Sequence, residues 1–561
     1  MYLKLISLVI ILFSCNNENK VDKLYYNGII WTGDKIIPYA SAIAVSGEHI
    51  VFVGTDEDAL NFIGHNTIKI DLKKKFITPG FIDSHVHLLS GGLQLSRLDL
   101  SDVNNKEEFQ RRIESADKEL KKSKWIVGGN WDHEKWGGKY PDKSWIDEIV
   151  ADRPILLDRL DGHMSLANSR ALEIAGINEQ TRNPIGGIIQ KDDNGLPTGI
   201  LKENAIELCR MYIPNESQED LDIALEKAMD YAISLGITQV HDMGYSQDSN
   251  PLRDLEVYMR NHIRNKLKIR IKRYSWYLGW KDLIKYIDNN GIGDDWLRWD
   301  GIKAMIDGSL GSKTAWMNKP YLVDNEHLSK KHTSSFGILA LEDTAAFKNI
   351  LINTDKANIQ HAVHAIGDQA NDWILNKYTN IMESNGFKDR RSRVEHAQHL
   401  SEEAISRFSK EKIIPSMQPY HLFDDGSWAH KRVGYDILSR TYVFRSLIDS
   451  GANLAFGSDW TVASLNPMTG IYAAVTRRTR DKKNQDGWFP NEKISVEDAL
   501  KCYTTNNAYA AFWEDKTGSI TVGKYADFLV HSKNLLTIDH NDLLESRILR
   551  TVVGGTDYIF E

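Results

Sequence analysis

Two histidines one residue apart stand in the stretch "ITPGFIDSHVHLLSGG", residues 77–92. His85 and His87 follow an apolar run that is typical of a buried β-strand. Residues i and i+2 of a strand point to the same face, so both imidazoles would project into one space. Neutral imidazole is the commonest protein ligand of metal ions such as zinc. The spacing therefore indicates a metal site at the end of this strand.

Two later strand-like runs bring a lysine and two carboxylates to similar positions. The run "GIKAMIDGSLGS" carries Lys303 and Asp307, and "NLAFGSDW" ends in Asp459. Such residues are usually structural when they occur singly, because an Asp at a strand end commonly caps a helix and a buried Lys has an ion-pair partner. Five strand-like runs in order, each with one residue able to face a common space, favour a shared site instead.

The remaining two runs each contain a pair of histidines. In "NIQHAVHAIGD" the two-residue alternation places His361 and His364 on opposite faces, so only one can point inward. We select His364 because it lies nearer the following Gly-Asp loop. In "SRVEHAQHL" the same choice arises between His396 and His399, and spacing alone leaves it open.

Strand-like runs alternate with helix-length stretches from residue 81 to about 505, among them "WIVGGNW", "PILLDRL", "ITQVHDMG" and "KIRIKRY". Repeated strand and helix units predict a parallel sheet, whose commonest closed form is a (β/α)₈ barrel. The segment from about 101 to 235 is longer than one such unit needs, so we expect an insertion there. Catalytic groups of such barrels gather at the C-terminal ends of the strands.

Both ends of the chain consist of short strands broken by turns. Residues 16–80 include "KLYYNGIIWTGD" and "AIAVSGEHIVFVGT", where Asn-Gly and Ser-Gly pairs are hairpin signals. Residues 506–561 return to strand in "GSITVGKYADFLVHSKN" and "ILRTVVGGTDYIFE". We expect the two ends to complete one β-sandwich beside the barrel.

Composition excludes one large class of partners. The 561 residues include 69 Lys and Arg against 77 Asp and Glu, a net charge of −8, without a basic run. Nucleic-acid binding therefore has no support, and a small-molecule substrate is expected. The sequence is compatible with a monomer or a homo-oligomer. Two of the three cysteines, Cys209 and Cys502, are expected to be buried free thiols.

The N-terminus "MYLKLISLVIILFSC" has a Lys followed by an apolar run that is too short to span a bilayer. This pattern predicts a secretory signal over residues 1–15. "LFSC" resembles a bacterial lipobox, which implies lipidation of Cys15 and anchoring of the exported protein to a membrane. The alternative is an apolar terminus with an incidental cysteine.

The motifs "GFIDSHVH", "KAMIDGSLGSKTA", "HAIGDQA", "RVEHAQ", "AFGSDW" and "GSITVGKYADFLV", in this order, resemble the metal-dependent amidohydrolase superfamily, specifically amidohydrolase family 3, the YtcJ-like proteins. The resemblance covers nearly the whole chain after the signal. It implies a distorted (β/α)₈ barrel with a urease-like β-sandwich formed by both chain ends. It also favours His396 over His399.

Carried over residue by residue, the resemblance implies zinc ligands at His85, His87, His364, His396 and Asp459. Lys303 stands where many members carry a carboxylated lysine that bridges two metals, whereas a plain lysine would mean one metal. Asp459 would take the proton of a metal-activated water and deliver it to the leaving group.

Substrate-binding residues are expected in the insertion and in the loop after the fourth strand. "GGNWDHEKWGG" and "LDGHMSLANSRAL" resemble the insertion that overhangs the barrel mouth in this family, so Trp131, His163 and Asn168 are pocket candidates. Packing within the insertion is the alternative role for these three. Asp307 precedes a Gly-rich loop suited to hold a substrate carbonyl. Glu203 is a further carboxylate that is either near the site or at a helix start.

These observations lead to one main hypothesis and two alternatives. The main one is a metal-dependent hydrolase that cleaves a non-peptide C-N bond of an amide, carbamate or cyclic amide. The second keeps the site and changes the bond to a lactone or phosphoester. The third is a non-catalytic binding lipoprotein on the same fold.

Overall fold

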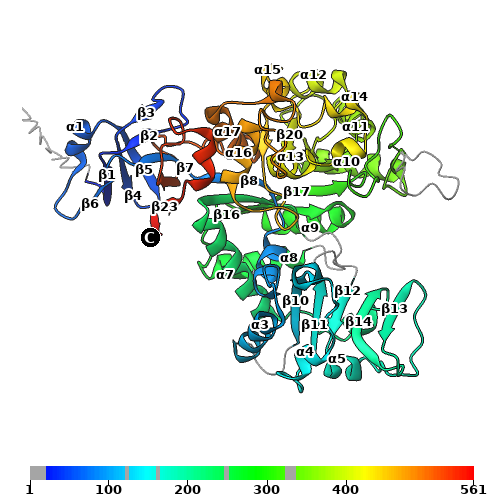
Figure 1. Ribbon diagram of the computed structural model, residues 1–561. Helices are drawn as coiled ribbons and strands as arrows, with labels where there is room; N and C mark the ends of the chain where they lie inside the picture. The colour runs from blue at the N-terminus through cyan, green and yellow to red at the C-terminus, as the bar shows by residue number, and fades with distance from the viewer. Residues whose placement is uncertain (1–19, 120–124, 160–163, 245–251, 323–335, 561) are drawn as a thin grey trace, which may run out of the picture.

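The computed structural model describes residues 20–119, 125–159, 164–244, 252–322 and 336–560. The described chain forms a barrel flanked by a β-sandwich and by an inserted β-sheet (Figure 1). The predicted signal, its Cys15 and the pocket candidate His163 lie outside the described residues.

Eight parallel strands form the barrel, and its predicted architecture is confirmed. A parallel bridge between Val86 and Trp460 brings the chain after the eighth strand to the first, so the sheet nearly closes. The strands are buried on both faces, as parallel strands covered by helices must be. In sheet order they are β8 (Phe81–Val86), β15 (Ile237–Asp242), β16 (Arg270–Trp276), β17 (Leu297–Met305), β18 (Gln360–Ala365), β19 (Arg393–His396), β20 (Ile414–Met417) and β21 (Ala455–Phe456).

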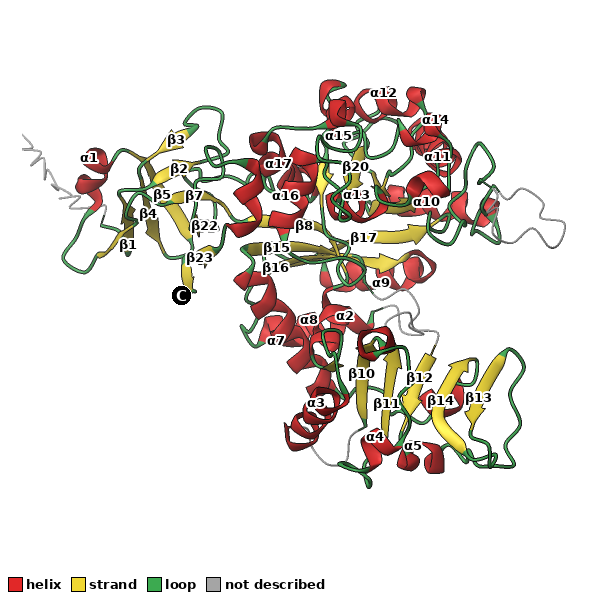
Figure 2. Cartoon of the chain, in the orientation of Figure 1, coloured by secondary structure: helices red, strands yellow, loops and turns green. Residues whose placement is uncertain are grey.

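Helices pack around this sheet (Figure 2). Several of them begin at side-chain caps. Ser217 forms a capping box with Asp220, and Ser401 and Asp343 accept hydrogen bonds from the first turns of their helices. The longer helices are α2 (Leu88–Leu95), α7 (Gln218–Ser234), α8 (Arg253–Ile263), α9 (Trp280–Asn290), α10 (Thr344–Lys356), α11 (Asp368–Asn385), α12 (Glu402–Lys410) and α16 (Pro467–Thr476). The shorter ones are α13 (Pro419–Asp425), α14 (Tyr435–Leu438), α15 (Phe444–Asp449), α17 (Val496–Cys502) and α18 (Thr505–Ala510).

Strands from both chain ends build the β-sandwich. One sheet has the order β5-β4-β1-β6 and the other the order β24-β23-β22-β7-β2-β3. Strand β22 pairs antiparallel with β7, which joins the C-terminal strands to the N-terminal ones. The strands are β1 (Lys23–Tyr26), β2 (Ile29–Trp31), β3 (Tyr39–Ala40), β4 (Ala42–Ser46), β5 (His49–Gly54), β6 (Ile68–Asp71), β7 (Phe76–Pro79), β22 (Phe528–His531), β23 (Ile548–Val553) and β24 (Thr556–Ile559). Short helix α1 (Asp56–Ala59) lies beside β4 and β5.

The insertion is a separate six-stranded sheet with its own apolar core. The runs "WIVGGNW" and "PILLDRL" are its strands β10 and β11 and are not barrel strands. Helix α7 lies within the residue range expected for the insertion, but it packs on α2 and its apolar face covers the barrel. The strands are β9 (Leu98–Asp99), β10 (Ile126–Trp131), β11 (Ile155–Arg159), β12 (Met164–Ala167), β13 (Gly187–Lys191) and β14 (Pro197–Glu203), and the helices are α3 (Lys106–Glu119), α4 (Ser144–Asp147), α5 (Ser169–Ile174) and α6 (Glu207–Arg210).

The helices of the described residues are short or amphipathic. Among them, no helix has the length and apolar character that crossing a bilayer requires. Cys209 and Cys502 are buried and free, as expected from the sequence.

A buried ion pair joins the barrel to the sandwich. Arg270, the first residue of β16, has Nε 2.8 Å from a carboxylate oxygen of Asp527, which immediately precedes β22. Its guanidinium also lies over the rings of Tyr525 and Trp296, 3.7 Å and 4.3 Å from their centroids. Asp527 accepts a further hydrogen bond from the Gly554 amide. The pair is therefore buried, and these contacts fix the orientation of both side chains.

Changing Asp527 to Asn is expected to lower the free energy of unfolding by about 3–5 kcal/mol, because it leaves a buried guanidinium without its counter-charge. Guanidinium chloride unfolding followed by circular dichroism measures this. Glu114→Gln, which breaks an exposed pair with Lys118, is the matched control and should leave the midpoint unchanged. An Asp527→Asn variant as stable as the parent would mean that apolar packing alone holds the two parts together.

Candidate metal centre

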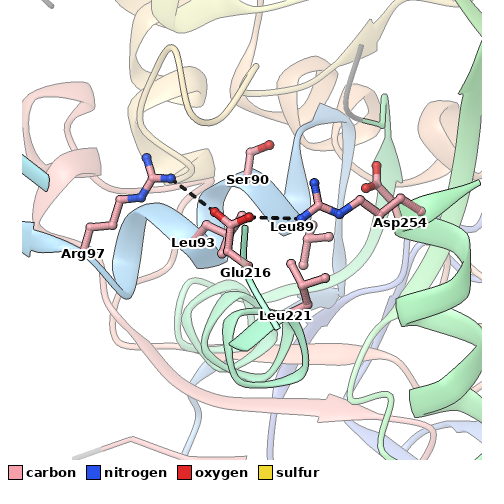
Figure 3. Close-up of a pocket in the computed structure, with 8 residues that line it drawn as sticks. Leu89, Ser90, Leu93, Arg97, Glu216, Leu221 and Asp254 are labelled. Atoms are coloured by element: carbon pink, nitrogen blue, oxygen red, sulfur yellow. Dashed lines mark hydrogen bonds and ion pairs between the residues drawn. The ribbon is translucent and has the colours of Figure 1, made fainter. Parts of the chain in front are cut away.

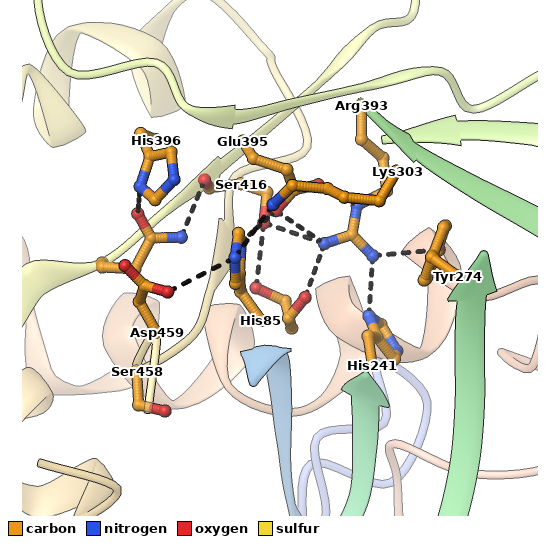
Figure 4. Close-up of polar contacts among 12 residues, drawn as sticks. His85, His241, Tyr274, Lys303, Arg393, Glu395, His396, Ser416, Ser458 and Asp459 are labelled. Atoms are coloured by element: carbon orange, nitrogen blue, oxygen red, sulfur yellow. Dashed lines mark hydrogen bonds and ion pairs between the residues drawn. The ribbon is translucent and has the colours of Figure 1, made fainter. Parts of the chain in front are cut away.

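Five strand ends bring the predicted ligand residues together. His85 comes from β8, Lys303 from β17, and Asp459 from the loop after β21 (Figure 4). His87 immediately follows β8 and precedes α2. His85 Nε2 lies 3.1 Å from Lys303 Nζ. The Nε2 atoms of His85 and His87 each lie 3.5 Å from Asp459 Oδ1. Two imidazoles at the end of β8 therefore face one carboxylate oxygen of a residue that lies hundreds of positions further along the chain.

His396 and His364 complete this cluster from β19 and β18. The ring of His396 has its centroid 5.0 Å from that of His85 and 4.5 Å from that of His364. His364 Nε2 lies 3.1 Å from the Gly308 carbonyl and 3.3 Å from Asp307 Oδ1, so that nitrogen donates and Nδ1 remains for a ligand.

The alternative histidines of the two pairs lie elsewhere. His361 Nε2 is 2.8 Å from Thr354 Oγ1, and its ring stacks on Tyr378. His399 Nδ1 is 2.8 Å from Thr441 Oγ1. Burial lowers the pKa of His361 to about 4 and that of His399 to about 3. Both are neutral core residues with hydrogen-bonding partners.

The backbone of β19 turns at His396 so that two consecutive side chains reach the site. His396 has φ +74° and Ala397 φ +43°, which non-glycine residues rarely adopt. Consecutive residues of a regular strand would face opposite sides. With this turn, Glu395 contacts His85 while His396 also faces the cluster. Asp459 likewise has φ +59°, and such strained residues concentrate at functional sites.

Three of the histidines have their Nδ1 atoms held by oxygen acceptors. His85 Nδ1 lies 2.7 Å from Glu395 Oε2, His87 Nδ1 lies 2.8 Å from the Gly244 carbonyl, and His396 Nδ1 lies 2.7 Å from Gln418 Oε1. An oxygen acceptor requires the ring nitrogen to carry hydrogen, so each neutral ring presents the lone pair of Nε2. Anchoring of the distal nitrogen in this way is typical of metal-ligating histidines.

The Nε2 atoms of His85 and His87 face the Asp459 carboxylate. The charge states of these groups show whether a cation fits between them. Burial, followed by the nearby Lys303 charge, lowers the pKa of His85 to about 4. Although burial opposes ionisation, hydrogen bonds from His421 and His87 hold the pKa of Asp459 well below its usual range. The neutral His85 ring therefore presents a lone pair to an ionised carboxylate. Although burial acts in the opposite direction, Asp459 raises the pKa of His87 and of His421, so a metal ion would take the place of protons on those two imidazoles. Nitrogen and oxygen donors of this kind suit zinc.

Lys303 is buried among these groups. Burial lowers its pKa to about 8, although the Glu395 and Asp459 carboxylates act in the opposite direction. A substantial fraction of the amine is therefore neutral slightly above neutral pH, and a neutral amine is the form that reacts as a nucleophile.

A buried ion pair beneath the cluster supports His85. Arg393 Nε lies 2.7 Å from Glu395 Oε1, and its Nη1 lies 2.8 Å from His241 Nδ1 and 3.1 Å from the Tyr274 hydroxyl (Figure 4). Arg393 and His85 hold the pKa of Glu395 far below its usual range despite burial. Sequence reasoning did not select this pair. The signal was two opposite charges at i and i+2 in a short strand, where charged residues are rare unless paired.

Asp83 and His421 were also not assigned from the sequence. Asp83 Oδ1 accepts hydrogen bonds from the backbone amides of His85 and Ser458, at 3.0 Å and 2.9 Å, and so ties β8 to the loop of Asp459. His421 lies on α13 with Nε2 3.3 Å from Asp459 Oδ2. The signal for His421 was its position in "MQPYHL", directly after the seventh barrel strand.

The substrate-binding candidates among the described residues, Asp307, Trp131 and Asn168, lie in structural positions. The Asp307 carboxylate accepts the amides of Ile366, Gly367 and Trp316, at 3.0, 2.8 and 2.9 Å, so it organises the loops beside His364. Trp131 is buried in the core of the insertion, where its indole N-H donates to the Leu157 carbonyl.

Asn168 and Glu203 also belong to the insertion. Asn168 caps α5, with its side-chain oxygen accepting the Ala171 and Ile155 amides. Glu203 ends β14, where a helix start was the alternative. For Trp131 and Asn168 the structure thus corrects the expectation of a pocket role, because packing and capping account for both side chains.

A cavity of about 120 Å³ borders helix α2, which begins at the residue after His87 (Figure 3). Glu216 lines this cavity. Its carboxylate oxygens lie 3.0 Å from a guanidinium nitrogen of Arg253 and 3.6 Å from one of Arg97. Leucines from α2 and α7 supply the apolar lining. The lining contains none of the six predicted ligands, so this cavity adjoins the candidate site without forming it.

Comparisons with known proteins agree with this geometry. A sequence profile of the amidohydrolase family matches residues 69–556. The chain is 39% identical over 541 residues to Protein LONG AFTER FAR-RED 3 of Arabidopsis thaliana, covering 95% of this chain and 91% of the relative. It is 30% identical over 545 residues to the putative amidohydrolase YtcJ of Bacillus subtilis, covering 95% and 98%.

Two further similarities concern an enzyme and a solved structure. N-substituted formamide deformylase of Arthrobacter pascens is 26% identical over 553 residues, covering 95% of this chain and 97% of the enzyme. A metal-dependent hydrolase from Pyrococcus furiosus superposes with a TM-score of 0.73 at 26% identity, covering 92% of this chain and 100% of that one. The match over most of the chain and the converging strand-end side chains lead to one conclusion: this protein belongs to the amidohydrolase family and is a hydrolase.

Proposed function

We propose that this hydrolase cleaves a non-peptide C-N bond, of an amide, carbamate or cyclic amide, with the help of bound zinc. The observation that carries the proposal is the meeting of the His85 and His87 Nε2 atoms with Asp459 Oδ1 at 3.5 Å, in a buried site whose imidazoles are anchored at Nδ1. The relative named for deformylation of N-substituted formamides supports the choice of an amide-type bond.

The side chains that would hold zinc are those of His85, His87, Lys303, His364, His396 and Asp459. A zinc ion in such a site polarises a carbonyl and lowers the pKa of water to about 7. With Lys303 carboxylated, its carbamate would bridge two ions, and with a plain lysine the site would hold one.

The residues of the chain have distinct tasks in this proposal. Asp459 accepts the proton of the attacking water and returns it to the leaving nitrogen, as a general base and then a general acid. Glu395 keeps His85 in one orientation, and the buried Arg393 keeps Glu395 ionised. Asp83 fixes the loop that carries Asp459 against the end of β8.

Export and anchoring through lipidated Cys15 are part of the proposal and rest on the sequence alone. Globomycin treatment of the producing cells, with detection of a larger precursor, is a direct assay for a lipoprotein signal. The mature protein would then act on small molecules in the periplasm or at the cell surface.

Metal content is the first test of the site. The soluble form that begins at Asn16 is expected to hold one or two equivalents of zinc by elemental analysis. Changing His85 and His87 together to Ala should remove at least one equivalent, because both are proposed ligands. His430→Ala, which changes an exposed histidine outside the cluster, is the control and should retain the parental content. A parent that stays metal-free after zinc is supplied would refute the hydrolase mechanism.

Turnover on a panel of amides, carbamates, cyclic amides, lactones and phosphotriesters tests the bond. N-substituted formamides head the panel, and hydrolysis confined to lactones or phosphotriesters would replace the C-N proposal. Asp459→Asn is expected to lower kcat by about 10²–10⁴-fold, because an amide cannot accept the water proton. Its zinc content should fall less than that of the double histidine variant. A variant with undiminished kcat would remove Asp459 from proton transfer.

Bicarbonate dependence tests carboxylation of Lys303. When apoprotein is reconstituted with zinc, added bicarbonate is expected to raise the bound metal, because carbon dioxide converts the amine into an oxygen ligand. Lys303→Met should abolish this response, and Lys281→Met, at an exposed lysine of α9, should preserve it. An equal response in the parent and in Lys303→Met would leave Lys303 as a plain amine.

A further inference from the structure

A second trio of ligand-type side chains shares Asp459 with the first. The potential ligand atoms of His85, His87 and Asp459 all lie within 4.8 Å of one another, and so do those of His396, His421 and Asp459. Asp459 faces His85 and His87 with Oδ1 and His421 with Oδ2. The carboxylate therefore spans two adjacent groups of imidazoles through separate oxygens.

Helix α13 is attached so that His421 is held in this trio. Gln418, the residue before the helix, accepts a hydrogen bond from His396 Nδ1 and donates through Nε2 to the Ser416 carbonyl at 3.2 Å. The amide of His421 donates to the Gln418 carbonyl at 3.1 Å. One residue thus positions both imidazoles of the trio, His396 directly and His421 through the first turn of α13.

The ring of His421 forms its hydrogen bond with a residue of the site. Among the described residues, Asp459 is its one hydrogen-bonding partner. Its side chain is 17% exposed and that of Asp459 is 10% exposed, so water competes little for either. His396, with Nδ1 engaged by Gln418, presents Nε2. Two imidazoles and a carboxylate form a donor set that zinc accepts.

We propose that His421 is a metal ligand, and that His396, His421 and Asp459 form a second cation position beside the one formed by His85, His87 and Asp459. His421 comes from the helix after the seventh strand and is not among the ligands expected from the sequence. Each carboxylate oxygen has two lone pairs, so Asp459 can face both positions and still accept a proton. This inference rests on the proposed zinc-dependent function.

The test uses zinc and cobalt(II) on the soluble full chain from Asn16, without any substrate. The parent is expected to bind two equivalents of zinc, and His421→Gln about one. Glutamine keeps an N-H that can donate to Asp459 but is a poor zinc ligand, so this variant separates ligation from hydrogen bonding. His430→Gln, at an exposed histidine nine residues further along, is the matched control and should bind two equivalents.

Cobalt(II) supplies the second measurement, because its visible spectrum reports the number and type of ligands. His421→Gln should lose the absorption of one of two cobalt ions, whereas its melting curve should remain cooperative. Should glutamine prevent folding, His421→Asn is measured in the same way. Two equivalents and a parental spectrum in a folded His421 variant would overturn the proposal, as would a parent that binds a single ion.

Failure of the proposed function gives a different result. A parent without any bound metal refutes the hydrolase mechanism and this inference together. A parent with two ions, of which one depends on His421, but without C-N hydrolysis on the panel, refutes the proposed bond and upholds the second cation position.

Discussion

The site depends on the meeting of an ionised carboxylate with imidazole lone pairs in a buried space. The carboxylate oxygens of Asp459 lie 3.5 Å from Nε2 of His85 and of His87 and 3.3 Å from Nε2 of His421. An imidazole nitrogen and a carboxylate oxygen that face one another at this distance need a proton or a metal ion between them, because two lone pairs would repel. The surrounding structure therefore has to hold these groups together before a cation arrives.

The fold holds them together with polar contacts that are satisfied within the chain. The buried Arg393 and Glu395 pair fixes His85 from below, Gln418 fixes His396, and Asp83 joins the end of β8 to the loop of Asp459. A buried charge without its partner costs several kcal/mol, so these groups tolerate few alternative arrangements. Pre-organisation of this kind is what metal affinity and catalysis require.

The two flanking parts relate differently to this centre. The β-sandwich, built from both chain ends, is attached to the barrel through the enclosed Arg270 and Asp527 pair. The insertion has its own core, and Trp131 and Asn168, which were expected to line a substrate pocket, serve its packing and capping. Asp307 likewise organises the loops around His364 through three backbone amides.

The sequence by itself determined the barrel, the sandwich and the candidate ligand residues at the strand ends, because period-two alternation and the order of strand and helix units are local properties of the chain. His85, His87 and Asp459 were recognisable in this way, and His364 was chosen over the opposite-facing His361 because it lies nearer the following Gly-Asp loop. Only the tertiary structure shows which groups contact these residues. The turn at His396, the Arg393 and Glu395 pair and the approach of His421 to Asp459 each depend on contacts between segments far apart in sequence. The tertiary structure also shows that Trp131 and Asn168 are buried in the insertion. Their residue types are common in ligand pockets, so the sequence could not distinguish the two roles.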